Sequence, residues 1–554
     1  MKNTDKTERK KERTEFYYLV VLLLTTAALL LINIWNTREF HCDDEYLYIK
    51  IAKEMFQSRE LWLPIWLQEP ALYKPPFIYW LMMSFFALFG PGLVVARLSV
   101  AVTALLTVFI VYQLGKKLYG VQAAFVAGLL TATSFGFIIY GKTGMLDLPL
   151  MCFFALAIYF FYRAFSEKSP LFAFLFWSTA GASALVKGPV SSIILFLIAA
   201  LFLTCYRGWK TFVKPGALGG MGLGLFFSAL WPLAMYLTGR FKLWYDFFVV
   251  RENLGKFADI HYTVMEFLPY YLQHIFPWSL LFLAALVLVF FRKRFMEPGY
   301  ALPLLWLLCT VLVFLLPATK LKHYLIPAVP AAALLIAGLW KEAREHKIFR
   351  AGMSLTAVIF IIIAAVIPLL MRLSSSLTPF LLLLAALAVL VLLIVFLFRS
   401  ALPQAIMSYA ALIFFLTLAG PYFTYDLFPQ GAIDRLSGTQ IPLGVVKTQI
   451  YSFSYFIDRR AVQLQTAEEM QKVLKDGGNV IVSETNLESF RKDVPDLTLS
   501  LAERYSWEKW KERLSTQEIL KALMTANPSL LREKVYLFET SETRRPGSDL
   551  DLLL

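Results

Sequence analysis

The chain has 554 residues, of which 58% are hydrophobic and only 17% are charged. A soluble protein of this length needs more charge to cover its surface, so the composition excludes a soluble globular protein and indicates a membrane protein. The net charge of +14 comes from Lys and Arg in short clusters between apolar runs, a pattern that sets membrane topology and excludes a nucleic-acid-binding surface.

A basic tail, residues 1–15, is followed by an apolar run from Phe16 to Trp35. The run is long for the core of a signal peptide, and no small-x-small cleavage pattern follows it. We therefore predict that this run stays in the protein as the first membrane helix and that residues 1–15 form a cytoplasmic tail.

Apolar runs of membrane-crossing length predict about 13 transmembrane helices within residues 16–421. The segment Phe77–Phe89 is too short to cross and is predicted to be a re-entrant or interfacial helix. The spans begin near Phe16, Leu93, Val121, Met145, Leu171, Val190, Ala217, Phe267, Gly299, Lys322, Ala351, Thr378 and Leu402.

Basic clusters predict the orientation of these helices, because short inner loops carry the excess of Lys and Arg. With the amino terminus inside, the clusters GKKLYG, FRKRF and KEAREHKIFR all fall on inner loops. The first outer loop is then 36–92, and an odd number of spans places the carboxyl terminus outside.

The composition changes at residue 422, where charge rises and the long apolar runs end. Strand-like runs at 444–446, 479–483 and 535–538 alternate with helical patterns at 467–475 and 517–525. This alternation predicts a small α/β domain over residues 422–554, on the outer side of the membrane.

Three carboxylates, Asp43, Asp44 and Glu45, come directly after the first span. Acidic side chains at membrane depth are costly unless they are paired or functional. A carboxylate here can act as a general base for an acceptor hydroxyl or orient a donor sugar. It can equally cap the positive end of a helix, and position alone does not separate these readings.

A second acidic residue, Asp147, stands at the start of the fourth span in the string YGKTGMLDLP, with Lys142 before it. A lone aspartate at a helix start is most often a cap, so the functional reading is the less common one for this motif taken alone.

Several cations are predicted on the same outer face as these acids. Lysine is a compact point charge that suits phosphate, so converging cations fit a phosphate-linked lipid. For a single Lys, snorkelling of the ammonium to water explains the position better, but this explanation weakens when several motifs share one face. The cations are Lys74, Lys187, Arg251, Lys256, Lys320 and Lys322.

A long outer loop carries Glu252 and His261, which are weak candidates for a metal site because zinc normally needs three or four protein ligands. The aromatic residues Tyr270, Tyr271 and Trp278 are predicted to form a belt at the membrane interface.

In this order, the motifs resemble those of bacterial glycosyltransferases of the GT-C class, including the aminoarabinose lipid A transferase and the protein-O-mannosyltransferase superfamily. The resemblance covers about residues 15–345, and the ordered set is specific where any single motif is not. The strings that carry it are DDEYLYIKIAKEM, LWLPIW, YKPPFIYWL, KTGMLDLP, LVKGP, RENLGKF and TKLKHYLIPAVP.

The resemblance implies roles for individual residues. Asp44 matches the catalytic position, with Glu45 beside it, and Asp147 matches the second acidic position. Lys74 and Tyr324 match residues that hold the phosphate of the lipid carrier.

Two positions depart from the family pattern. Lys256 stands where many relatives have Arg, and Tyr73 stands where the aminoarabinose transferase has Glu. The second departure leaves the sugar and the metal requirement open.

We therefore expect a GT-C-like glycosyltransferase of a bacterial inner membrane, with a periplasmic carboxyl-terminal domain. The expected donor is a polyprenyl-phosphate sugar, and the expected acceptor is a lipid A-like glycolipid or a protein. No cofactor is required by the motifs, and a divalent metal is left open. A flippase for polyprenyl-linked sugars and a structural assembly protein are the alternatives.

Overall fold

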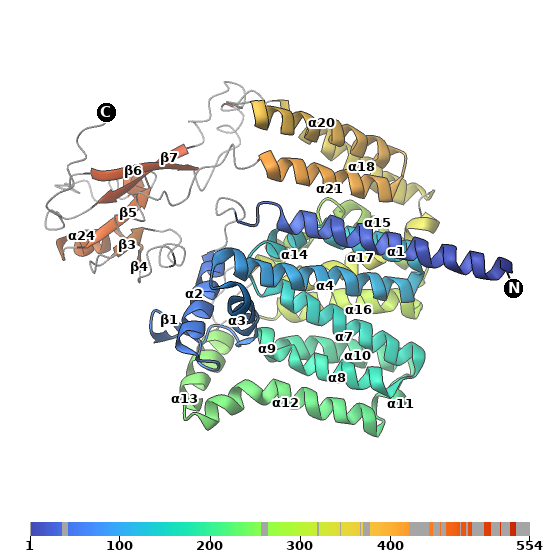
Figure 1. The fold of residues 1–554 in the computed structure, drawn as a ribbon, viewed down its shortest axis with the longest axis horizontal. Coiled ribbons are helices and arrows are strands. Elements are labelled where there is room, and N and C mark those ends of the chain that lie inside the picture. Colours follow the sequence, from blue (N-terminus) through green and yellow to red (C-terminus); the bar gives the residue numbers. More distant parts are fainter. Residues whose placement is uncertain are drawn as a thin grey trace. The chain divides into compact units, whose positions relative to one another are not determined.

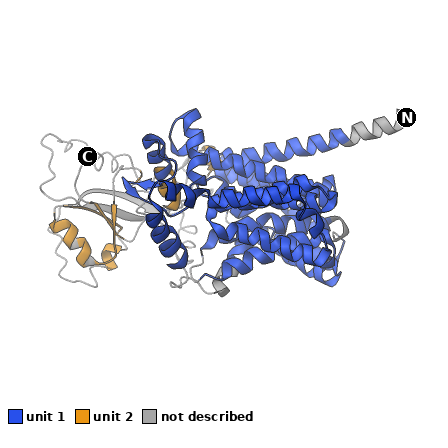
Figure 2. Ribbon diagram, turned by 90° about the horizontal axis from the view of Figure 1, so that it is seen from below, with its two compact units in different colours: residues 1–35, 51–367, 381–418 blue, residues 36–50, 368–380, 419–554 orange. Residues whose placement is uncertain are grey.

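The computed structural model is mostly helical (Figure 1), with a small sheet near the carboxyl terminus. It describes residues 2–35, 43–255, 264–317, 321–343, 345–365, 367–368, 377–419, 443–446, 455, 461–476, 478–483, 486–489, 503–510, 521 and 532–538. The chain divides into two compact units, coloured separately in Figure 2. Unit 1 comprises residues 1–35, 51–367 and 381–418, and unit 2 comprises residues 36–50, 368–380 and 419–554.

Long apolar helices make up most of unit 1. The longer ones are α1 (Lys2–Leu31), α4 (Leu93–Tyr119), α5 (Val121–Ala132), α7 (Asp147–Glu167), α8 (Pro170–Ala182), α10 (Pro189–Tyr206), α12 (Pro215–Leu237), α15 (Ser279–Phe291), α16 (Pro298–Leu315), α17 (Val329–Ala343), α18 (Lys347–Ala364), α20 (Leu377–Phe398) and α21 (Leu402–Ala419).

Other elements connect these helices. They are α2 (Asp43–Ser58), β1 (Ile65–Trp66), β2 (Glu69–Pro70), α3 (Phe77–Phe89), α6 (Phe135–Gly141), α9 (Ala184–Lys187), α11 (Trp209–Phe212), α13 (Phe241–Trp244), the π-helix η1 (Tyr245–Leu254), α14 (Val264–His274), η3 (Arg294–Met296) and the 3-10 helix η4 (Lys322–Ala328).

The membrane-spanning prediction agrees with the structure in most places. Among the described residues, 11 helices are long and apolar enough to cross a membrane, and α5 with α6 forms a further bent pair with an angle of 62°. The helix α3 has 13 residues, as the sequence predicts for a segment too short to cross. The polytopic helical fold is therefore confirmed.

The eighth predicted span differs, because the run that begins near Phe267 is divided into two helices. α14 ends at His274 and α15, with 13 residues, begins at Ser279. Pro277 lies between them and cannot donate the backbone hydrogen bond that a continuous helix needs. The break matters below, because it leaves His274 at a helix end.

The helices α8 and α12 approach each other closely through small residues, as membrane helices do where glycine lets two backbones meet. A Cβ atom at Gly220 would lie 2.3 Å from the carbonyl oxygen of Phe174, and one at Gly224 would lie 2.3 Å from that of Trp177. This packing fixes α8, which leads directly into α9 and Lys187.

Unit 2 contains a five-stranded sheet with the strand order β4-β3-β5-β7-β6. The strand β3 is parallel to both of its neighbours, β4 and β5, and β7 is antiparallel to both of its neighbours, β5 and β6. The strands are β3 (Leu443–Val446), β4 (Ala461–Leu464), β5 (Asn479–Ser483), β6 (Glu503–Trp510) and β7 (Arg532–Phe538).

The helix α24 (Ala467–Lys475) connects β4 to β5 and begins with a capping box formed by Thr466 and Glu469. Its apolar face packs on the sheet through Met470 and Leu474. The predicted helix at 467–475 and strand at 479–483 are both present, so the α/β expectation is confirmed. The predicted helix at 517–525 lies largely outside the described residues.

Candidate active site

One buried acidic side chain of the predicted site is Asp147, the first residue of α7. It is fully buried, and its Oδ1 atom accepts a hydrogen bond from Nζ of Lys187 at 3.1 Å. The cap of α7 is Leu146, without a side-chain cap hydrogen bond. Asp147 therefore pairs with a distant lysine instead of capping its own helix, although the helix dipole still favours its charge.

The second carboxylate oxygen of Asp147 is also buried, and it has no hydrogen-bond partner within the described part of the chain. Buried polar atoms are nearly always hydrogen-bonded, so an unsatisfied carboxylate oxygen needs an explanation. A substrate hydroxyl that donates to Oδ2 would satisfy it. This free acceptor is the first sign that the pair has more than a structural role.

Lys187 is the last residue of α9, and only 9% of its side chain is exposed. The helix stops there because Gly188 adopts a φ of 87°, and α10 begins at Pro189. The Lys187 ammonium lies 4.4 Å from the ring centroid of Tyr324, so it contacts both a carboxylate and an aromatic face.

Tyr324 belongs to η4, and its ring packs against Phe314 at a centroid distance of 5.2 Å. Its side chain is buried. The family resemblance predicts that Tyr324 holds the carrier phosphate, and in the structure the Lys187 ammonium lies over its ring.

Lys74 lies in the loop before α3 and is half-buried. Both Lys74 and His323 are near enough to Asp147 to interact electrostatically with its carboxylate. Lys74 is also near enough to Lys187 for the two ammonium charges to interact, while the ion pair of Asp147 is made with Lys187. Together, Lys74, Asp147, Lys187 and Tyr324 form a charged cluster in unit 1, which we call the Asp147 cluster.

The segment η4 is held at both ends by side chains of α14. Nε2–H of His274 donates to the main-chain carbonyl of Lys322 at 2.6 Å, and the Tyr271 hydroxyl donates to the carbonyl of Ala328 at 2.9 Å. These two bonds bracket Tyr324. The α14 helix therefore determines where the Tyr324 ring lies.

His274 was not singled out in the sequence, because a histidine in an aromatic run has no motif spacing. A signal was present: a polar residue within the apolar string LPYYLQHIFPW, three residues before the proline at which the helix is broken. The imidazole is buried and packs edge-on against Tyr140 at 5.9 Å. A Cβ at Gly136 would lie 2.9 Å from Nδ1 of His274.

The predicted interface belt is wrong for two of its three aromatic residues. Tyr271 is 5% exposed and Trp278 is 1% exposed. The Trp278 indole N–H donates to Oγ1 of Thr133 at 3.0 Å. Both rings are interior packing residues, because their polar atoms find protein partners and do not need interfacial water.

The first acidic cluster lies in α2, and its members belong to unit 2. Asp44 is half-buried and Glu45 is fully buried. The next residue, Tyr46, packs against Tyr455 of the same unit, with ring centroids 5.4 Å apart.

The other predicted cations lie in different surroundings. The Arg251 guanidinium lies over the ring of Phe247 at 5.0 Å, and the Lys322 ammonium lies over Tyr270 at 5.0 Å. Lys256, Lys320 and His261 lie outside the described residues.

Of the weak metal candidates, only Glu252 lies within the described part of the chain, in η1. Across that part, no group of three or more His, Cys, Asp or Glu side chains could hold a metal ion.

Part of the chain, including most of the Asp147 cluster, is similar in sequence to known proteins. The sequence profile described as dolichyl-phosphate-mannose-protein mannosyltransferase matches residues 73–233, a range that includes Lys74, Asp147 and Lys187. An uncharacterized protein from Aquifex aeolicus is 26% identical over 384 residues, which is 68% of this chain and 74% of that protein.

Named relatives match a shorter region. The undecaprenyl phosphate-alpha-4-amino-4-deoxy-L-arabinose arabinosyl transferase of Pseudomonas paraeruginosa is 27% identical over 303 residues. The match spans 53% of this chain and 54% of that protein, so this chain matches about half the length of the named transferases.

The fold is similar to that of ArnT from Cupriavidus metallidurans bound to undecaprenyl phosphate. The TM-score is 0.65 at 16% sequence identity, with 94% of this chain and 97% of the other covered. The apo state of the same protein gives a TM-score of 0.64 at 17% identity. The predicted resemblance to GT-C-class glycosyltransferases is confirmed by the sequence profile, the relatives and the fold taken together.

Proposed function

We propose that this chain is a membrane glycosyltransferase of the GT-C class that uses a polyprenyl-phosphate sugar as donor. The observation that carries the proposal is the buried Asp147–Lys187 pair, whose carboxylate keeps one oxygen free. A pair built only for stability would have both oxygens hydrogen-bonded. Relatives that use undecaprenyl-phosphate aminoarabinose support the donor class.

In the proposed reaction, an acceptor oxygen attacks the anomeric carbon of the donor sugar. The bond from that carbon to the phosphate oxygen breaks, and the phosphate leaves with the electron pair. Lys74 and Lys187 supply positive charge for the departing phosphate, as fixed cations do where negative charge develops in a transition state.

The acceptor proton passes to a carboxylate, which we assign to Asp44, with Glu45 beside it. Asp147 receives a hydrogen bond from a substrate hydroxyl through its free Oδ2. If the acceptor is itself a phosphate, it needs little deprotonation, and Asp44 then acts by orienting the substrate.

The acceptor is proposed to be a lipid A-like glycolipid or a protein. The site is proposed to face the periplasmic side of a bacterial inner membrane, because the basic clusters lie on the opposite loops. Arg251, Lys256, Lys320 and Lys322 are proposed as further contacts to the donor phosphate or to neighbouring lipid headgroups.

The purified chain in lipid nanodiscs tests this function. It is mixed with an undecaprenyl-phosphate sugar and a lipid A acceptor, and the products are followed by mass spectrometry. Asp147→Asn and Asp44→Asn should each lower the transfer rate by roughly 100-fold, the size expected when a positioned carboxylate is lost.

The control variant is Glu69→Gln, which neutralises an exposed carboxylate of the same outer loop and should transfer at the wild-type rate. Wild-type transfer by a folded Asp147→Asn variant would remove Asp147 from the mechanism. Movement of the sugar-lipid across sealed vesicles without product would instead identify a flippase.

A further inference from the structure

A second polar site lies far along the chain from the Asp147 cluster, where α17, α18, α20 and α21 meet at their ends. It is a pocket of about 610 Å³. This volume is within the range of small-molecule sites, about 300–1,000 Å³. Its lining consists of Trp340, Glu345, Arg350, Phe398, Arg399, Ser400, Ala401, Pro403 and Gln404.

Two arginines from different parts of the chain line this pocket. Arg350 lies in the first turn of α18, and Arg399 directly follows α20. Both are exposed, and neither guanidinium forms a hydrogen bond or ion pair with the described residues. Glu345 supplies the opposing charge, so the lining carries a net charge of about +1 at neutral pH.

Local hydrogen bonds shape the two turns that present these arginines. Nδ1 of His346 accepts a hydrogen bond from the amide of Ile348 and caps α18. Ser400 adopts a φ of 53°, and the amide of Ala401 donates to the carbonyl of Phe396 at 2.9 Å. This left-handed turn ends α20 and directs the chain into α21, with Arg399 at its start.

An apolar stripe leads away from the pocket along α20. Phe398, Val395 and Val391 are spaced three and four residues apart, so they share one helix face. They are 49%, 37% and 52% exposed. A charged pocket continuous with an exposed apolar stripe has the two-part character of a phospholipid, which joins a phosphate to acyl chains.

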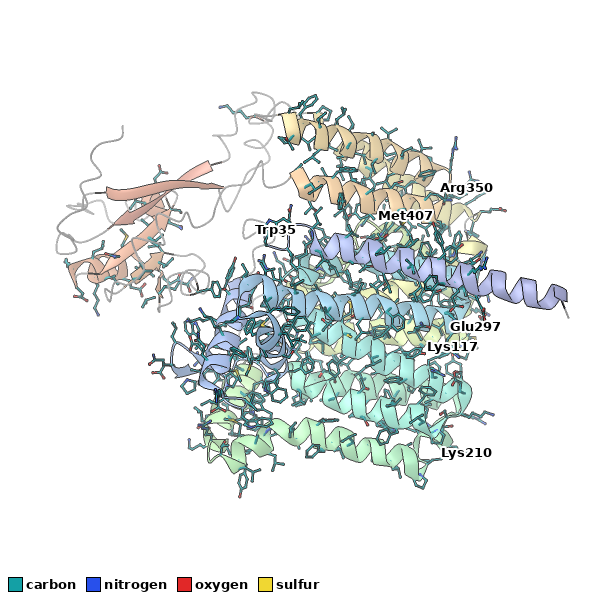
Figure 3. The ribbon with its side chains drawn as sticks, in the orientation of Figure 1. Trp35, Lys117, Lys210, Glu297, Arg350 and Met407 are labelled. Atoms are coloured by element: carbon teal, nitrogen blue, oxygen red, sulfur yellow. The ribbon has the colours of Figure 1, made fainter. Side chains whose placement is uncertain are left out.

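The pocket lies at the end of the bundle that the sequence predicts to face the cytoplasm. Figure 3 shows Arg350 at the same end of unit 1 as Lys117, Lys210 and Glu297, with Trp35 at the other end. Basic pockets between transmembrane helices on the cytoplasmic side are typical binding sites for anionic lipid headgroups.

We propose that this pocket binds the phosphate headgroup of an anionic phospholipid. The guanidinium groups of Arg350 and Arg399 contact the phosphate, and the acyl chains lie along the stripe of Phe398, Val395 and Val391. Arginine suits this role because its planar fork of donors matches phosphate oxygens. The site does not depend on the proposed transferase activity.

Native mass spectrometry of the full chain in a zwitterionic detergent tests the proposal, with phosphatidylglycerol and phosphatidylcholine as the probes. Wild-type protein should retain one phosphatidylglycerol saturably and no phosphatidylcholine under the same conditions. The double variant Arg350→Gln/Arg399→Gln should bind phosphatidylglycerol about tenfold more weakly, because each basic residue near an anionic lipid surface raises the affinity severalfold.

The matched control is Lys210→Gln/Lys214→Gln, which removes two exposed positive charges outside the pocket lining. Lys210 lies at the same end of the bundle as Arg350. Affinity within twofold of wild type supports the pocket. An equal loss in both double variants would show that surface charge alone attracts the lipid and would overturn the proposal.

A third arm separates the lipid from free phosphate. Val391→Ser/Val395→Ser should weaken phosphatidylglycerol binding, because it makes the stripe polar while leaving both arginines in place. Displacement of the lipid by submillimolar inorganic phosphate would overturn the lipid assignment. Thermal unfolding of each variant without lipid shows whether the variant is folded. If Arg350→Gln/Arg399→Gln is unfolded, the charge-retaining variant Arg350→Lys/Arg399→Lys takes its place. An affinity for phosphatidylglycerol between that of wild type and no binding then supports the site.

Discussion

The Nε2 atom of His274 lies 2.6 Å from the main-chain carbonyl oxygen of Lys322, and this contact ties α14 to the 3-10 segment that carries Tyr324. Tyr271 makes the matching contact at the other end of that segment. The aromatic ring over the Lys187 ammonium is thus positioned by a helix that contributes no residue of its own to the Asp147 cluster.

His274 and Gly136 should be energetically coupled. His274→Ala leaves the Lys322 carbonyl without its donor, which should lower the free energy of unfolding by about 1–3 kcal/mol. Gly136→Ala should displace the imidazole, because the new Cβ would lie 2.9 Å from it. Both variants should also slow transfer, because Tyr324 loses part of its support.

Thermal or denaturant unfolding of the two single variants and the double variant measures this coupling. Removing the imidazole takes away the contacts of the new methyl group with Nδ1 and Cγ of His274, although the Cβ of residue 274 would still lie 2.9 Å away. The double variant should therefore be less destabilised than the sum of the single variants by about 0.5 kcal/mol. Gly92→Ala is the control, because its Cβ meets nothing within 4 Å. Strict additivity would refute the coupling.

Removing one partner of the Asp147–Lys187 pair should destabilise the protein strongly, whereas replacing both partners with neutral residues should destabilise it much less. Lys187→Met leaves a buried carboxylate without its cation, which should destabilise the protein by about 3–5 kcal/mol. Asp147→Asn/Lys187→Met removes both charges and should recover much of that stability. Transfer should stay low in both variants, because the cation that we assign to the departing phosphate is absent.

Unfolding curves in detergent and the mass-spectrometric transfer assay separate these effects. If Lys187→Met were as stable as wild type, the pair would not be held in the buried state that the structure shows. If the double variant transferred sugar at the wild-type rate, neither residue would take part in the reaction.

The close approach of α8 and α12 predicts opposite outcomes for two neighbouring glycines. Gly220→Ala places a Cβ 2.3 Å from the carbonyl oxygen of Phe174, so the helices must separate and the protein should lose roughly 1–3 kcal/mol of stability. Gly222→Ala lies on the same helix with nothing within 4 Å and should be neutral or slightly stabilising. Thermal unfolding of both variants checks this, and equal melting temperatures would contradict the packing.

The carboxyl of Glu60, in the first outer loop, should make the free energy of unfolding of the protein depend on pH. Burial raises the pKa of this carboxyl, but hydrogen bonds from the amides of Trp62 and Leu63 and from Arg240 outweigh burial and hold the pKa below its usual range. A carboxyl whose pKa is lowered on folding stabilises the protein above its unfolded pKa of about 4.3. That stabilisation is lost as the pH falls through the folded pKa.

The measurement is the difference in unfolding free energy between wild type and Glu60→Gln across pH. It should be about 1 kcal/mol at pH 7, because the partner Arg240 is partly exposed. The difference should shrink on acidification below about pH 4. A difference that grows on acidification would have the wrong sign and would contradict the assignment.

The local pattern of the sequence was sufficient for much of the fold. Hydropathy predicts most of the spans, and the length of the apolar run identifies Phe77–Phe89 as a short helix. The change of composition after residue 422 predicts the α/β unit, where β3, α24 and β5 appear at the expected positions. These features depend on the residues within one segment, so they can be read from that segment alone.

Only the tertiary structure decided which polar residues meet. Asp147 and Lys187 are 40 residues apart, and nothing in either motif states that they form a pair. Tyr271 and Trp278 have the composition of an interface belt, yet they are buried and hydrogen-bonded inside the bundle. The contacts of a side chain depend on which helix faces pack together, and that choice is made by the whole bundle and not by any one helix.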